Sequence, residues 1–192
     1  MAAPSTHRNA DRRTAPAPLV AGAARYATSN VRAIMKDELF LRPWLAHRDA
    51  VLAIEVTDDQ KCFLDDLSVA EFLADDDEHP TFTSYAVCHG ENVVGLVCYG
   101  REVEHESWRW WIPLLVIDMQ HQGKGYGRAV TEAVIARIRV EAHDCRAVGL
   151  TCKPENVVAE RLYRSLGFNP AGTNPRGGID MWLALEPFRG SV

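Results

Sequence analysis

Residues 114–128 read Leu-Leu-Val-Ile-Asp-Met-Gln-His-Gln-Gly-Lys-Gly-Tyr-Gly-Arg. The first four residues are apolar and predict a buried strand, and glycines then alternate at positions 123, 125 and 127. A helix is predicted directly afterwards, because Val130, Val134 and Ile138 recur every four residues on one face. A glycine-rich loop between a strand and a helix N-terminus lets several backbone N–H groups converge on an anion. The pattern therefore predicts a pyrophosphate-binding turn.

Spacing excludes two common nucleotide-binding motifs from this loop. A Walker loop requires Ser or Thr after its Gly-Lys pair, whereas Gly125 follows Lys124 here. A dinucleotide-binding GxGxxG loop would place its third glycine one position later than Gly127. The next predicted strand, Arg146–Thr151, also ends without the carboxylate that would bind a ribose. A different pyrophosphate carrier is indicated.

The pattern over residues 37–187 predicts one domain of mixed α and β structure. Alternating or β-rich runs predict strands over Glu38–Trp44, Thr81–His89, Asn92–Tyr99, Ser107–Asp118, Arg146–Thr151 and Ile179–Leu185. Helical periodicity predicts helices over Ala46–Val56, Asp58–Leu64, Ser68–Leu73 and Asn156–Leu166. Gly90 and Glu91 predict a hairpin turn, and Pro113 predicts a bulge or a sheet edge because it lacks an N–H.

Charge is unevenly distributed along the chain. The 192 residues carry 21 Lys and Arg against 26 Asp and Glu, a net charge of −5. Residues 1–36 hold six basic residues and one acidic residue, whereas residues 55–78 hold ten carboxylates and one lysine. The overall acidity argues against nucleic acid as a partner, because phosphate binding requires a basic surface. No apolar run approaches the roughly 20 residues of a membrane span.

The ends of the chain and its cysteines indicate in which cellular compartment the protein is located. Residues 1–36 lack apolar periodicity and predict a disordered basic tail, and residues 188–192 predict a short C-terminal tail. A targeting peptide is the alternative, disfavoured by Pro16 and Pro18, and translation starting at Met35 is a third possibility. Five scattered cysteines and dispersed histidines show no metal-site spacing. We expect reduced, buried thiols and a cytoplasmic location.

Two motifs resemble those of a known enzyme family. Gln122–Gly127 is similar to the Q/RxxGxG/A acetyl-CoA motif of the GNAT superfamily of N-acetyltransferases. Asn156–Phe168 is similar to the second motif of that family, NxxAxxLYxxxGF, and the order and spacing of the two agree. The resemblance implies an α/β fold whose mixed, mostly antiparallel central sheet is flanked by helices. It also implies a splay at a bulge on the fourth strand, at Leu115–Ile117.

The resemblance also implies acetyl-CoA as co-substrate and no metal. Backbone amides of the splayed strand would bind pantetheine and polarise the thioester carbonyl, and Tyr163 would protonate the departing thiolate. Asn156 would contact the pantetheine arm, although its position fits a helix N-cap equally well. The implied cofactor-binding residues are Leu115, Val116, Ile117, Gln122, Gly123, Lys124, Gly125, Tyr126, Gly127, Arg128, Asn156 and Tyr163.

A closer resemblance concerns the acceptor. Phe40–Pro43, Asp58–Phe63 and Ser68–Glu71 look like diamine/spermidine N-acetyltransferases, whose fold places the acidic segment 55–78 over the acceptor. A carboxylate-lined cleft would concentrate a polycation. The candidate acceptor-binding residues are Asp58, Asp59, Glu102 and Glu104. Glu102 and Glu104 are also substitutes for a catalytic base, because Ile112–Leu115 lacks the Glu that some relatives carry there.

Departures from the family pattern leave the acceptor open. Gly178 stands where polyamine relatives usually carry Glu, and Leu114 stands where they often carry Arg. We expect N-acetylation of a small cationic amine, most readily a polyamine. A peptide or protein N-acetyltransferase and a non-catalytic acyl-CoA-binding regulatory module are the alternatives. Trp108, Trp110 and Trp111 would supply either core packing or a homodimer interface.

Overall fold

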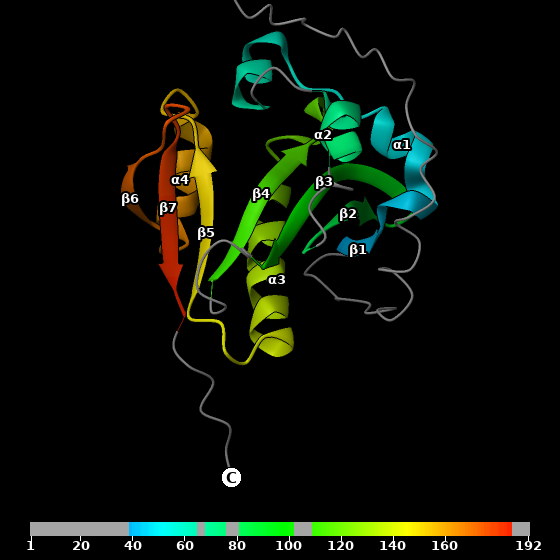
Figure 1. Ribbon diagram of the computed structural model, residues 1–192. Helices are drawn as coiled ribbons and strands as arrows, with labels where there is room; N and C mark the ends of the chain where they lie inside the picture. The colour runs from blue at the N-terminus through cyan, green and yellow to red at the C-terminus, as the bar shows by residue number, and fades with distance from the viewer. Residues whose placement is uncertain (1–38, 65–67, 76–80, 102–108, 186–192) are drawn as a thin grey trace, which may run out of the picture.

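A seven-stranded sheet forms the centre of the computed structural model, which describes residues 39–64, 68–75, 81–101 and 109–185 (Figure 1). The strand order is β1-β2-β3-β4-β5-β7-β6. The strands are β1 (Leu39–Pro43), β2 (Phe82–His89), β3 (Asn92–Arg101), β4 (Arg109–Ile117), β5 (Ala147–Cys152), β6 (Asn169–Thr173) and β7 (Ile179–Ala184). Only β4 and β5 run parallel, so the expected mixed and mostly antiparallel sheet is confirmed. The two tails expected at residues 1–36 and 188–192 lie outside the described residues.

Helices cover both faces of this sheet. They are α1 (Arg48–Leu52), α2 (Val69–Asp75), α3 (Tyr126–Glu141) and α4 (Val157–Ser165), with 3₁₀ turns η3 (Trp44–His47), η4 (Asp58–Leu64) and η6 (Met119–His121). Figure 1 shows α1, α2 and η4 at the upper end of β3 and β4, whereas α3 passes behind these strands and α4 lies beside β5 and β7. Within the described ranges, no helix is both long and apolar enough to cross a membrane.

The two faces of the sheet bury separate apolar clusters. One contains the predicted α3 stripe of Val130, Val134 and Ile138, packed against residues such as Val87 and Val97. The other cluster lies under α1 and α2, and its strand residues alternate along each strand with those of the first cluster. Its buried members are Trp44, Val51, Val69, Leu73, Ala86, Cys88, Leu96, Cys98, Leu114 and Val116. Strand side chains alternate between faces, so each strand of the hairpin contributes to both clusters.

A bulge on β4 separates the sheet into two halves. Cys98 lies opposite Leu114 and Gly100 lies opposite Trp111, so β4 has one extra residue at Ile112–Pro113. The extra residue reverses the side-chain parity, because Ile112 joins the α3 cluster whereas Leu114 joins the α1/α2 cluster. Pairing between β4 and β5 also stops at Ile112. The bulge therefore lies just before the predicted Leu115–Ile117, and the strands splay beyond it.

The predicted helix Ala46–Val56 is wrong in its extent. It is divided into η3 and the five-residue α1, which ends at Leu52. Beyond it, the Asp118 carboxylate accepts a hydrogen bond from the Glu55 N–H (3.1 Å), and the Glu55 carbonyl accepts one from the Met119 N–H (2.8 Å). These long-range bonds use the backbone groups that a longer helix would have paired internally. The segment is instead fastened to the loop that follows β4.

Two further expectations need correction. Strand β6 was not predicted, because Asn-Pro-Ala-Gly-Thr has the composition of a turn, and it forms as a fully exposed edge strand beside β7. Cys62 is exposed, whereas the other four cysteines are buried as expected. Trp111 packs edge-on against Trp182 at 5.1 Å between ring centroids, which favours core packing for this residue. Trp108 lies outside the described residues.

Candidate active site

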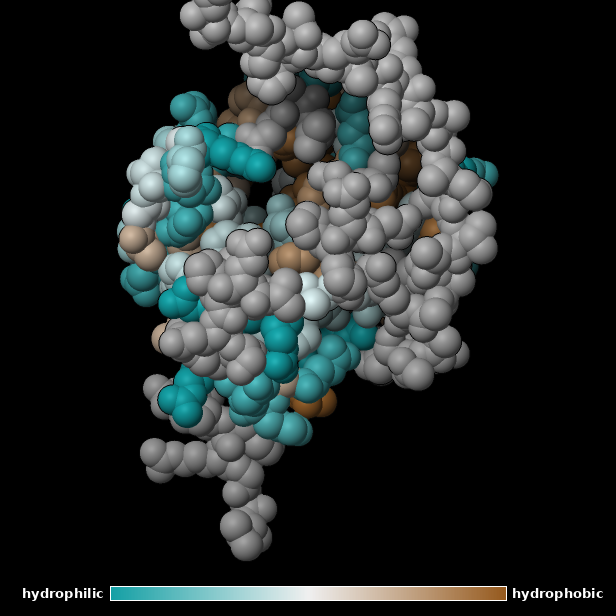
Figure 2. Space-filling view, viewed as in Figure 1, coloured by the Kyte–Doolittle hydropathy of each residue, from teal (hydrophilic) through white to brown (hydrophobic). Residues whose placement is uncertain are grey.

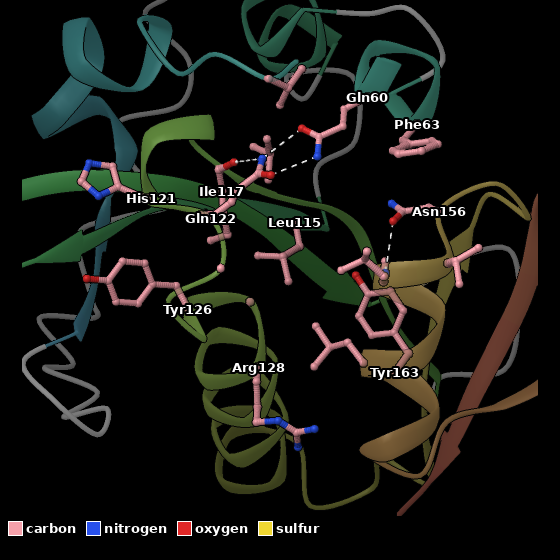
Figure 3. A pocket seen from close by; sticks show the side chains of 18 of the residues that line it. Gln60, Phe63, Leu115, Ile117, His121, Gln122, Tyr126, Arg128, Asn156 and Tyr163 are labelled. Carbon is pink, nitrogen blue, oxygen red and sulfur yellow. Dashed lines mark hydrogen bonds between the residues drawn. The ribbon is translucent and has the colours of Figure 1, made fainter. Parts of the chain in front are cut away.

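The splay opens a cavity of about 620 Å³ between the two halves of the sheet. Figure 2 shows the molecule hollowed here, with apolar side chains around the hollow. The lining comes from η4, β4, the glycine loop and α4, and Figure 3 shows these side chains converging from opposite sides. Among the predicted cofactor-binding residues, it brings together Leu115, Val116, Ile117, Gln122, Gly123, Gly125, Tyr126, Gly127, Arg128, Asn156 and Tyr163. Lys124 is exposed and lies outside this lining, with its Nζ 3.4 Å from His121 Nδ1.

The edge of β4 that faces this cavity has no partner strand among the described residues beyond Ile112. Asp118 N–H donates to the Val94 carbonyl (3.0 Å), toward β3, whereas the carbonyl of Ile117 faces the opposite edge. Backbone groups of successive residues alternate between the two edges of a strand. Leu115 shares the parity of Ile117, and β5 pairs with β4 only as far as Ile112, so the Leu115 N–H and carbonyl face the open side. A bound molecule can therefore pair with this edge as a further strand would.

The glycine loop and the start of α3 form the second wall. Gly123 and Gly125 have φ of +75° and +83°, a left-handed conformation that glycine adopts without steric cost. No atom lies within 4 Å of where a Cβ would stand on either residue, so the space above the loop is open. Gly125 caps α3, a helix of 16 residues, and the first N–H groups of a helix have no partner within it. The loop thus presents several amide donors and the positive end of a helix dipole to one space.

Gln122 and Gln60 form a reciprocal amide pair at the entrance to this loop. Gln122 Nε2 donates to Gln60 Oε1 and Gln60 Nε2 donates to Gln122 Oε1, both at 3.0 Å. Gln122 Nε2 also donates to the Ile117 carbonyl (2.9 Å), as Figure 3 shows. Gln60 was not among the predicted site residues, because a neutral amide in an acidic segment matches no catalytic or binding motif.

Asn156 and Tyr163 approach the cavity from α4. Asn156 Oδ1 accepts the Ala159 N–H (3.1 Å), so the N-cap role is present, while its amide NH₂ makes no hydrogen bond to a described residue. The Tyr163 ring packs edge-on against Phe168 at 5.8 Å, and Figure 3 shows its hydroxyl pointing into the cavity between Leu115 and Asn156. Burial raises the pKa of Tyr163 above its ordinary value, and the neighbouring Cys152 thiol acts in the same direction. The phenol is therefore neutral near pH 7 and can donate a proton.

Arg128 and Tyr126 complete the predicted set on α3. Arg128 hydrogen-bonds to Ser165 of α4 and to Glu132 (3.4 Å), four residues further along α3. Its guanidinium therefore joins α3 to α4 below the cavity. The Tyr126 ring lies 5.6 Å from that of His89.

The structure separates the predicted acceptor residues. Asp59 lines the cavity that contains Tyr163, and its carboxylate makes no ion pair with a described residue. Asp58 lines a second cavity on the other side of η4, and it is paired with Lys61 at 2.6 Å. The hydrogen bond from Lys61 lowers the pKa of Asp58. Glu102 and Glu104 lie outside the described residues.

The Glu71 carboxylate is likewise hydrogen-bonded within its own segment. Glu71 Oε2 accepts both the N–H and the hydroxyl of Ser68 (2.7 Å each), and Ser68 Oγ accepts the Glu71 N–H (3.2 Å). This arrangement is a capping box at the start of α2. Of the described carboxylates in the acidic segment, Asp59 is the one that lines the Tyr163 cavity.

These residues fit acetyl-CoA. The open loop above Gly123 and Gly125, at the N-terminus of α3, suits a pyrophosphate, and the free edge of β4 suits the amides of a pantetheine arm. The hydroxyl of Tyr163 points to the region where that edge ends its pairing with β5 (Figure 3). No group of three or more metal-ligating side chains occurs among the residues that the structure describes.

Comparisons with known proteins find similar acetyltransferases. Spermine/spermidine N(1)-acetyltransferase of Bacillus subtilis (strain 168) is 27% identical over 143 residues, covering 72% of this chain and 86% of the relative. The crystal structure of spermidine N-acetyltransferase from Vibrio cholerae, in complex with CoA and spermine, superposes with a TM-score of 0.58 at 19% identity, covering 77% of this chain and 95% of that one.

A third similar protein is named for a different acceptor, an aminoglycoside. An aminoglycoside acetyltransferase in complex with coenzyme A superposes with a TM-score of 0.59 at 18% identity, covering 76% of this chain and 94% of that one. Likeness at these identities shows a shared fold. Residues 44–168, more than half of the chain, match the sequence profile of the family described as "Acetyltransferase (GNAT) family". The chain belongs to the GNAT family of acetyltransferases, which use acetyl-CoA.

Proposed function

We propose that this enzyme transfers the acetyl group of acetyl-CoA to a primary amine of a small cationic acceptor, a polyamine in the first instance. The observation that carries the proposal is Asp59, an acidic residue on the same cavity as Tyr163 whose carboxylate makes no ion pair with a described residue. An ammonium group held near that carboxylate is kept close to the open edge of β4. The B. subtilis relative, named for spermine and spermidine, supports the same class of acceptor.

The roles of the residues follow from their positions. Acetyl-CoA, when bound, supplies an activated thioester. The backbone N–H groups on the open edge of β4 donate hydrogen bonds to the carbonyl oxygen that becomes negative during attack. The neutral amine attacks the acetyl carbon, and water takes up the protons that the nitrogen loses before and after the carbon–nitrogen bond forms. As the carbon–sulfur bond breaks, Tyr163 gives its hydroxyl proton to the departing sulfur and regains one from water. The glycine loop binds and orients the pyrophosphate through backbone amides.

The test is release of CoA thiol from acetyl-CoA with spermidine, spermine, short diamines, an aminoglycoside and short peptides as acceptors. We expect the highest kcat/KM with polyamines. A preference for peptides would replace the polyamine proposal with peptide N-acetylation. Tight CoA binding without turnover on any amine would identify a non-catalytic acyl-CoA-binding module.

A matched pair of variants tests the role of Asp59. Asp59→Asn is expected to raise the KM for spermidine about tenfold, because it removes a carboxylate that attracts the cation and makes no ion pair with a described residue. Asp58→Asn makes the same charge change one residue away, on the other cavity and on a group already paired with Lys61. It is expected to change that KM less than about twofold, as for an exposed ion pair. Equal effects of the two substitutions would show that only the net charge of the segment matters.

A further inference from the structure

Gln60 connects the acceptor side of the cavity to the glycine loop. It belongs to η4, one residue after Asp59, and it lies opposite Gln122 across the top of the cavity in Figure 3. The two hydrogen bonds between the side-chain amides, both at 3.0 Å, join residues 62 positions apart in the chain. Both side chains are partly buried, so water competes less for these bonds than at an exposed site.

Each amide of the pair is also held by the backbone on its own side. Gln60 Oε1 accepts the Thr57 N–H (3.3 Å), at the start of the η4 segment. Gln122 Nε2 donates to the Ile117 carbonyl (2.9 Å), on the open edge of β4. The pair therefore forms a continuous hydrogen-bonded path from η4 to the strand edge and the loop.

The other contacts of η4 lie at its end or within the turn. Leu64, its last residue, packs against the α1/α2 cluster. None of its residues is fully buried, and its ion pair, Asp58 with Lys61, lies within the turn itself. The Glu55–Asp118 bonds fasten the chain only before η4 begins. Among the described side-chain hydrogen bonds, the Gln60–Gln122 pair is therefore the one that ties the middle of η4 to the glycine loop, one residue from Asp59 on the cavity wall.

We propose that Gln60 is a positioning residue that couples acetyl-CoA binding at the glycine loop to the ordering of the acceptor segment. Ordering of Gln122 with the loop orders Gln60, and thereby presents Asp59 to the cationic acceptor. This rests on the proposed function for the identity of the acceptor, but the coupling itself involves only the residues of this chain and acetyl-CoA.

The kinetic test compares three substitutions of glutamine. Gln60→Leu keeps a similar volume and removes the amide, and it is expected to raise the KM for the acceptor about tenfold while changing kcat and the Kd of acetyl-CoA less than about threefold. Gln60→Glu keeps an acceptor for Thr57 N–H and Gln122 Nε2 but loses the donor, so an intermediate KM is expected. Gln120→Leu is the control, because Gln120 is an exposed residue of η6 outside the lining of the cavity. An acceptor KM in Gln60→Leu equal to that of the control would overturn the proposal.

Hydrogen exchange tests the coupling without an acceptor. Acetyl-CoA is expected to slow amide exchange in residues 122–128 of both the wild type and Gln60→Leu, but to slow it in residues 58–64 of the wild type alone. Unchanged slowing of residues 58–64 in Gln60→Leu would refute the coupling and leave the proposed function standing. Absence of slowing in residues 122–128 of the wild type would instead remove acetyl-CoA from this loop, and the proposed function with it.

Discussion

Tyr163 combines a position on the cavity with surroundings that keep its hydroxyl protonated. Burial against the α3 cluster and Phe168 raises its pKa, so the phenol is neutral where the enzyme works. The family resemblance indicated its place in the chemistry. By contrast, Gln60 and Asp118 were missed as structural links, because their partners are 62 and 63 residues away in the chain.

Removing the Tyr163 hydroxyl tests its role as the proton donor. Tyr163→Phe is expected to lower kcat about 100-fold, as for loss of a general acid, with the Kd of acetyl-CoA unchanged. The ring and its contact with Phe168 are retained, so folding should be preserved. Steady-state kinetics and calorimetric titration with acetyl-CoA measure the two quantities. An unchanged kcat would assign Tyr163 to core packing only.

The raised pKa of Tyr163 also predicts the alkaline side of the pH profile. A general acid is lost when pH rises through its pKa, and burial moves that point above the ordinary tyrosine value of 10.0. The kcat of the wild type should therefore show no loss assignable to Tyr163 up to about pH 10. The comparison is the pH dependence of kcat for the wild type and Tyr163→Phe. A descending limb below pH 10 that disappears in the variant would contradict the protected environment.

At the scale of elements, the strand–loop–helix unit of residues 114–141 follows from local sequence more completely than any other part. Its apolar strand, glycine turn and four-residue stripe are each local signals, and all agree. The helix predicted at Ala46–Val56 is shorter in the structure because contacts with distant residues override its local pattern. Its apolar pattern is real, but hydrogen bonds to Asp118 and Met119, far along the chain, decide where it ends.

A substitution in the glycine loop separates backbone strain from ligand binding. Gly125→Ala places a Cβ on a residue with φ +83° and is expected to cost about 1 kcal/mol of unfolding free energy and to weaken acetyl-CoA binding about tenfold or more. Gly177→Ala is the matched control, because Gly177 has φ +78° and equally open surroundings but lies outside the cavity. It should lose similar stability and bind acetyl-CoA as the wild type does. Equal affinity in both variants would argue against the loop as the binding site.

At the scale of the whole molecule, the cavity exists because two halves of one sheet share a short parallel contact. Residues 109–112 of β4 pair with residues 147–150 of β5, and beyond them the strands part around the site. Gly149 lies in this contact, beneath the rings of Trp111 and Trp182. A Cβ there would overlap the Trp111 ring and lie 2.8 Å from the Trp182 ring.

Gly149→Ala should therefore destabilise the junction of the two halves. We expect a loss of about 1–3 kcal/mol in the free energy of unfolding, as for overpacking of a filled core. Chemical denaturation measures it, and Trp111→Leu in the same background is expected to restore part of the loss by removing the overlapping ring. Additive losses in the double variant would show that the tryptophan contact is not the cause.

Local sequence was enough to predict the glycine loop, the two motifs, the order of the main strands and helices, and the excess of carboxylates before α2, because each depends on neighbouring residues. Only the folded chain shows that Pro113 marks a bulge and not a sheet edge, that Asp59 and not Asp58 lines the Tyr163 cavity, and that Gln60 meets Gln122. Strand register and the direction of a short 3₁₀ turn are set by pairing and packing between distant segments. Adjacent acidic residues can therefore line different cavities although their sequence context is the same.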